Sequence, residues 1–140
     1  MSAMSVEVHS EVGTLRSVLV HRPGLEIARM TATDFERLLF DDILSPDLAG
    51  QEHDLLCHIL ASFGATVRDI RDVLIDALRA VDNGTRIAFV EQLCDQEGVH
   101  EIAKEVADWP AARLGTALIE GILWDEVGKA DEPVRSTLAR

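Results

Sequence analysis

Basic residues are scarce in this sequence. Its 140 residues hold 13 Lys and Arg against 25 Asp and Glu, which gives a net charge of -12 at pH 7. The acidic residues are spread along the chain rather than gathered in a tail. Because nucleic-acid binding relies on clustered cations that neutralise phosphates, the composition disfavours a nucleic-acid partner. It permits, but does not require, a cationic small-molecule ligand.

Long apolar runs are also missing. No stretch approaches the roughly 20 residues that a membrane-spanning helix needs. The first residues, MSAMSVEVHSEVG, carry neither a basic patch nor the apolar segment of a secretory leader. We therefore expect no membrane partner and a cytoplasmic location. The hydrophobic fraction of 47% is still enough for one folded domain, or for a piece of a larger one.

Cysteine is rare, with Cys57 and Cys94 only, which fits reduced thiols better than a disulfide framework. His53 and Cys57 are spaced to share one face of a predicted helix, opposite its apolar stripe and open to solvent. A structural zinc site needs four ligands, and the sequence has no second pair of His or Cys residues nearby. We expect no metal ion, and we interpret both cysteines as structural rather than nucleophilic.

Two common enzyme motifs are absent. No Gly-rich phosphate loop follows the first predicted strand, because HRPGLE holds a single glycine and no lysine. No Gly-x-Ser-x-Gly nucleophile elbow occurs either. We interpret Trp109 and Trp124 as core or cap residues rather than ligand-stacking platforms. The sequence therefore predicts no cofactor.

Two strands are predicted in the first half of the chain. LRSVLVH, residues 15–21, contains three consecutive apolar residues, which predicts a strand covered on both faces. A short helical segment is predicted over residues 31–40, and ATVRDI, residues 65–70, predicts a second strand. Two strands alone are marginal in water. Either the helical half covers them or the rest of the sheet lies elsewhere.

The clearest predicted helix lies between these strands. Ser45 is suited to cap its start and Pro46 to its first turn, while Gly64 is suited to a left-handed C-cap. Its apolar residues fall at helical spacing on one face. They are Leu48, Leu55, Leu56, Ile59, Leu60 and Phe63. Strand, helix and strand together predict one α/β unit.

The second half shows only helical periodicity. Four apolar stripes follow one another between Arg71 and Gly128, interrupted near Asn83-Gly84, at Gly98 and at Trp109-Pro110. Short amphipathic helices with brief links form small bundles. We therefore predict an α/β portion over residues 1–70 and an all-helical bundle of four to five short helices over residues 71–140.

The stretch LLFDD, residues 38–42, sets three apolar residues directly before two acids. Alone, this pattern is typical of a packed helix end whose acids face water. The alternative is that the backbone and one carboxylate lie over a cavity and contact a cationic ligand. Spacing does not choose between the two.

Several segments together resemble the N-terminal part of arginine deiminases. In order along the chain they are VHSEVGTLRSVLVHRPGLEIARM, LLFDD, QEHDLLCHILASFGATV and LIEGILWDEVG. Residues 6 to about 70 carry most of the match. The resemblance implies the opening strands and helix of a pentein-like α/β-propeller blade, followed by a helical bundle inserted in that blade. Further strands of the propeller would then explain the low strand count.

The resemblance also implies a reaction, in which a cysteine attacks the guanidinium carbon of L-arginine to give L-citrulline and ammonia. The Phe-Thr-Arg-Asp, His-x-Asp and near-terminal cysteine motifs of the family are absent from these residues, and neither Cys57 nor Cys94 matches that cysteine's context. We assign no catalytic residue and predict no turnover by this chain alone. The resemblance places Leu39, Phe40 and Asp41 beside the amino-acid end of the substrate.

Three hypotheses remain. The first is a portion of an arginine deiminase-like hydrolase, which would bind L-arginine or a related guanidino compound once a C-terminal part is supplied. The second is a non-catalytic, truncated deiminase-like domain, whose strand edge and apolar face would favour a homo-oligomer or a second chain as partner. The third, an unrelated helical regulator, ignores the order of the motifs.

Overall fold

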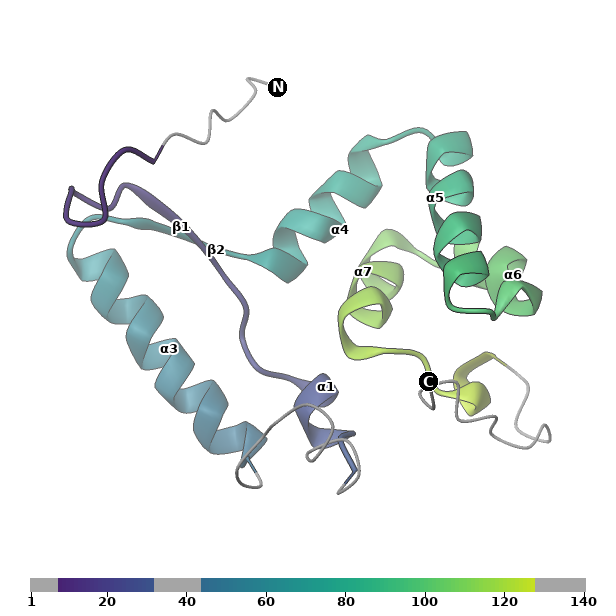
Figure 1. Cartoon of the computed structure of the whole chain (residues 1–140), viewed down its shortest axis with the longest axis horizontal. Coiled ribbons are helices and arrows are strands. Elements are labelled where there is room, and N and C mark those ends of the chain that lie inside the picture. Colours follow the sequence, from purple (N-terminus) through teal and green to yellow (C-terminus); the bar gives the residue numbers. More distant parts are fainter. Residues whose placement is uncertain (1–7, 32–43, 128–140) are drawn as a thin grey trace.

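The computed structural model describes residues 8–31 and 44–127 (Figure 1). Strand β1 (Ser17–Val20) pairs in parallel with β2 (Thr66–Asp69). Helix α3 (Pro46–Ser62) lies between them in the chain, as a parallel connection requires. The predicted strand–helix–strand unit is therefore confirmed, whereas a propeller blade stays a prediction, as does the division of the chain at residues 70 and 71.

Helices make up most of the rest of the described chain. In order they are α1 (Leu25–Ala28), α4 (Ile70–Ala80), α5 (Asn83–Gln96), the 3-10 helix η1 (His100–Ile102), α6 (Ala103–Ala107), α7 (Ala111–Glu120) and the 3-10 helix η2 (Trp124–Val127). Figure 1 shows α3 below the two strands on the left and α5 and α6 on the right, with α4 and α7 between them. No helix in the described ranges is long and apolar enough to cross a membrane.

The ends of α3 form as predicted. The Ser45 hydroxyl accepts a hydrogen bond from the Leu48 amide at 3.4 Å, and Pro46 occupies the first turn, where its missing N–H costs nothing. Gly64 follows the helix with φ +88°, a left-handed conformation that glycine adopts without strain. These local signals needed no tertiary partner, which is why the sequence predicts them well.

The predicted break near Asn83-Gly84 is confirmed, and it falls just before these two residues. Helix α4 ends at Ala80, and Asn83 opens α5. The Asp82 carboxylate accepts from the Thr85 hydroxyl at 2.6 Å and from the Thr85 amide at 3.0 Å. These bonds, the hydroxyl's first, lower the pKa of Asp82 and cap the new helix. The predicted helix over 31–40 lies outside the described residues beyond Thr31, and the short α1 was not predicted.

The core lies in the helical half. Its buried side chains come from α4, α5, η1, α6, α7 and η2, with Leu114 of α7 fully buried and Trp109 only 6% exposed. The core interpretation of Trp109 is confirmed, and that of Trp124 concerns a side chain outside what the structure describes. Cys94 is also buried there, and its burial, helped by Asp95 and Glu101, raises the pKa of its thiol. Its structural role is therefore confirmed.

The α/β half buries far less of its apolar surface. Leu19 of β1 is 55% exposed, so the prediction that this strand is covered on both faces is wrong. The apolar stripe of α3 also faces outward, with exposed fractions between 45% and 83% for Leu48, Leu55, Leu56, Ile59 and Phe63. The opposite face of α3 is the covered one, because the His53 side chain is only 14% exposed and Gly50 is buried. The predicted solvent-open position is therefore wrong for His53, whereas Cys57 is partly exposed.

Candidate functional site

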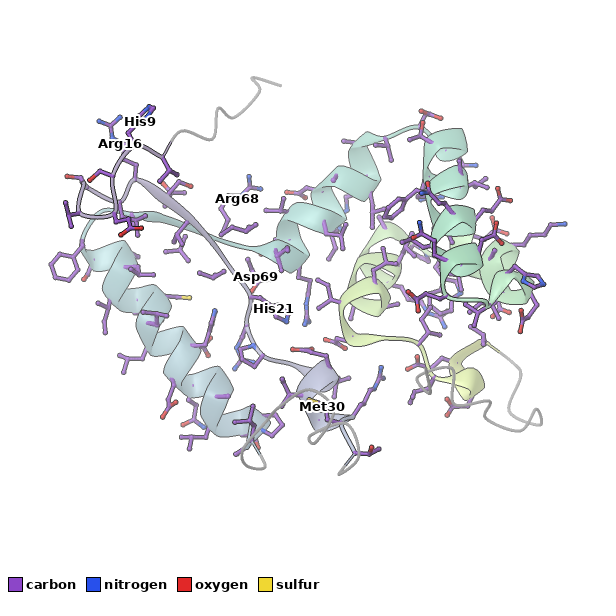
Figure 2. All side chains as sticks on the ribbon, viewed as in Figure 1. His9, Arg16, His21, Met30, Arg68 and Asp69 are labelled. Atoms are coloured by element: carbon purple, nitrogen blue, oxygen red, sulfur yellow. The ribbon has the colours of Figure 1, made fainter. Side chains whose placement is uncertain are left out.

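A polar cluster surrounds the loop that follows β1, at the carboxyl ends of the two parallel strands. Ligands of open α/β sheets bind at such ends. Figure 2 shows His21 and Asp69 close together there. His21 Nε2 lies 3.0 Å from Glu26 Oε1, and the Gly24 amide donates to the same oxygen at 2.7 Å. Glu26 therefore fixes the turn made by the sequence His-Arg-Pro-Gly.

The Glu26 carboxyl is held in its ionised form. Its partial burial works to raise its pKa, but the hydrogen bonds from the Gly24 amide, from its own amide and from His21 outweigh burial and lower the pKa. Its second oxygen, Oε2, and Nδ1 of His21 are buried without a hydrogen-bond partner. Such atoms are rare in folded proteins, and they mark this loop as a place where polar groups converge.

We expect Glu26→Gln to lower stability at neutral pH and to flatten its acid dependence. A carboxyl whose folded pKa is lowered stabilises the fold above its ordinary value of 4.5. That stabilisation is lost as the pH falls through the lowered folded pKa. Urea midpoints measured from pH 7 down to about pH 3 should therefore converge for the two proteins at the acid end. Glu97→Gln, at the exposed end of α5, is the control, and an equal effect of both variants would contradict the assignment.

Arg22 joins three elements. Its amide donates to Asp69 Oδ2 at 2.9 Å, and its guanidinium donates to both oxygens of Asp54 on α3, at 2.9 and 3.1 Å. The hydrogen bond from Arg22 is the main cause that lowers the pKa of Asp54. A Cβ on Gly50 would come within 2.7 Å of Arg22 Nη2, so this glycine allows the close approach. The pair orients α3 and explains why its polar face lies inward.

A second set of polar contacts connects the segment after β1, and the start of α4, to the end of α7. Arg71, at the start of α4, lies 2.7 Å from Glu120 Oε1 on α7, and the Glu120 side chain is only 9% exposed. Arg29, which follows α1, donates to the carbonyl oxygens of Glu120 and Gly121 at 3.1 and 3.0 Å and pairs with Glu126 at 3.1 Å. The end of α7 is thus fixed against both α1 and α4.

A pocket of about 410 Å³ opens between these groups. It is lined by Arg22, Pro23, Gly24, Leu25, Ala28, Pro46, Asp47 and Glu120. A Cβ on Gly24 would lie 3.0 Å from Glu26 Oε2 and 3.1 Å from Arg71 Nη2, so the charged side chains approach this glycine closely. Charged and apolar groups line the cavity together, as in small-molecule sites, although Arg22 is paired with Asp54 and Glu120 with Arg71.

The predicted substrate residues Leu39, Phe40 and Asp41 lie outside the described residues, and their role stays a prediction. Ala28, which precedes this segment in the chain, and Pro46, which follows it, both line the pocket. The sequence did not single out Arg22 or Glu120 as site residues. The His-Arg-Pro-Gly motif was a usable signal for Arg22, whereas nothing in the spacing points to Glu120.

No metal site is found in the part of the chain that the structure describes, since no three His, Cys, Asp or Glu side chains are grouped to hold an ion. The pair suggested by the sequence spacing does come together, because Cys57 Sγ lies 3.6 Å from His53 Nδ1 on the covered face of α3. These two ligands are fewer than a structural zinc site requires.

Comparison with known proteins adds a family. A model of the arginine deiminase family matches residues 36–120. Arginine deiminases from Rhodococcus opacus (strain B4) and Rhodococcus jostii (strain RHA1) are each 38% identical over 124 residues, which cover 85% of this chain and 30% of theirs. The arginine deiminase of Limosilactobacillus reuteri (strain DSM 20016) is 33% identical over 128 residues, 87% of this chain and 31% of its own. The chain thus spans about 30% of the length of these curated relatives.

Proposed function

The chain belongs to the arginine deiminase family, and from that premise we propose that it forms the N-terminal part of a hydrolase that converts L-arginine and water into L-citrulline and ammonia. The observation that carries the proposal is the match to relatives named arginine deiminase over 85% of the chain. A cytoplasmic location is part of it, and the two free cysteines support that location.

In this proposal the chain contributes one wall of the substrate site. The pocket beside the His-Arg-Pro-Gly loop places the Asp47 carboxylate where it would meet a cationic group of an amino acid, next to the Arg22–Asp54 and Arg71–Glu120 ion pairs. Leu39, Phe40 and Asp41 would contact the amino-acid end of L-arginine. The cysteine nucleophile and the histidine that moves protons would come from the remainder of the enzyme, so no catalytic residue is assigned here.

The test is complementation. The 140-residue chain would be mixed with a separately expressed fragment of the Rhodococcus opacus relative that lacks the matching 30%, and citrulline would be measured. We expect no citrulline from either piece alone and turnover from the mixture. Asp41→Asn in the chain should raise KM by roughly tenfold, because it removes the negative charge that would pair with the cationic substrate. Glu97→Gln, exposed at the end of α5, is the control. Turnover by the chain alone, or an inactive complex of the two pieces, would refute the proposal.

A second candidate is a non-catalytic interaction domain derived from the same fold. The exposed apolar side chains of α3 favour it, because soluble monomers rarely expose a contiguous apolar row. The same mixture separates the two candidates. If the relative's fragment fails to bind, while the chain alone forms an oligomer that Leu55→Glu dissociates, the interaction domain is the better reading.

A further inference from the structure

A thiol, an imidazole and a carboxylate follow one another on the covered face of α3. Cys57 Sγ lies 3.6 Å from Nδ1 and 3.8 Å from Nε2 of His53, one helical turn away. His53 Nδ1 is in turn 3.9 Å from Asp54 Oδ1. The Asp54 contact is too long for a hydrogen bond, so the pair that matters is a thiol within reach of an imidazole base, as found in activated nucleophiles.

The sulfur of Cys57 lies near both a base and a charged pair. The Asp54 carboxylate would oppose negative charge on the sulfur, but the two hydrogen bonds from Arg22 neutralise it. His53 Nδ1, at 3.6 Å from Cys57 Sγ, is within reach of the thiol proton. Cys57 is partly exposed, so a small reagent can reach it, whereas Cys94 is buried in the core.

We propose that Cys57 is a modification site that takes low-molecular-weight disulfides. His53 accepts the thiol proton, and the Cys57 thiolate attacks one sulfur of the disulfide. The sulfur–sulfur bond of the reagent breaks, a new one forms to Cys57, and the departing thiolate takes the proton from His53. The disulfide is the oxidant and is reduced to one thiol. This reaction is separate from arginine hydrolysis, which we assign to a cysteine outside this chain.

The test measures the two cysteines side by side. The folded 140-residue chain would be treated with oxidised glutathione and the modified peptides counted by mass spectrometry, while 2,2′-dithiodipyridine would give the rates optically. We expect Cys57 to react at least about tenfold faster than Cys94, and His53→Gln to slow Cys57 by roughly ten- to a hundredfold. The matched control is His58→Gln, whose ring lies beside the Asp54 carbonyl at 2.7 Å and which should leave the rate within about twofold.

Two further measurements separate proton transfer from a structural role. Added imidazole should restore much of the rate of His53→Ala, because a free base can replace the lost one, whereas a packing defect would not respond. The helical circular dichroism of each variant is the second measurement, because a variant that keeps its helices can lose rate only through the lost base. Equal rates for the two cysteines, or a His53→Gln rate equal to that of the unmodified chain, would overturn the proposal.

Discussion

Leu114→Ala is expected to lower the free energy of unfolding by about 3 kcal/mol. Leu114 is fully buried at the centre of the helical core, where α7 meets the other helices. Removing its side chain loses the transfer free energy of the deleted carbons and leaves a cavity that the packed helices cannot fully close. Since whole domains are stable by only about 5–15 kcal/mol, the change is large. Urea unfolding followed by the helical circular dichroism signal measures it.

The control is the same substitution on α3. Leu55 is 61% exposed, so Leu55→Ala deletes atoms that are already in water and should change stability by less than about 0.5 kcal/mol. A loss at Leu55 as large as that at Leu114 would mean that the outward row of α3 is covered in solution. Equal, small losses at both positions would contradict the described core.

The helical half was the more predictable part of the fold because its apolar stripes bury one another. Helices α4 to α7 follow close in sequence, so a stripe such as that of Leu74 and Leu78 meets its partners within a short length of chain. Caps and left-handed glycines are local as well. The break near Asn83-Gly84 was a local signal too, and the hydrogen bonds of Asp82 set where α5 begins.

The orientation of α3 could not be read from its sequence. Periodicity shows that its leucines share one face, but it does not say which face meets the sheet. The deciding contacts are made by Arg22, whose guanidinium binds Asp54 across 32 residues and passes close over Gly50. Long-range polar contacts of this kind leave no periodic trace. Hydrophobic patterning alone therefore predicted the opposite orientation.

In the candidate site, too, the local features were predictable and the long-range contacts were not. The turn at His-Arg-Pro-Gly and its glycine were visible in the sequence, and the resemblance drew attention to them. The pairing of Arg71 with Glu120, and the hydrogen bonds from Arg29 to the end of α7, depend on how α1, α4 and α7 meet. Only the fold brings these residues together, so the pocket that they border had to be found in the structure.

Gly115→Ala should cost about 1–2 kcal/mol of stability, although alanine is the better helix former. In a free helix the change would gain up to about 1 kcal/mol. Here, however, the new Cβ would lie 2.6 Å from Cγ1 of Ile75 and 3.6 Å from its Cα, where α7 packs on α4. The clash involves a branch close to the backbone, so the helices must move apart, and overpacking of this kind typically costs about 1–3 kcal/mol.

A double-mutant cycle isolates that contact. Ile75→Ala removes Cγ1, the atom that the new methyl group would meet at 2.6 Å. In that background Gly115→Ala should become neutral or stabilising by up to about 1 kcal/mol, because only the helix preference remains. The difference corresponds to a coupling free energy of about 1–3 kcal/mol, above that of independent sites. If Gly115→Ala instead stabilised the unmodified chain, α4 and α7 would not approach as closely as described. Urea unfolding of the four proteins therefore tests the packing of the helical half independently of any activity.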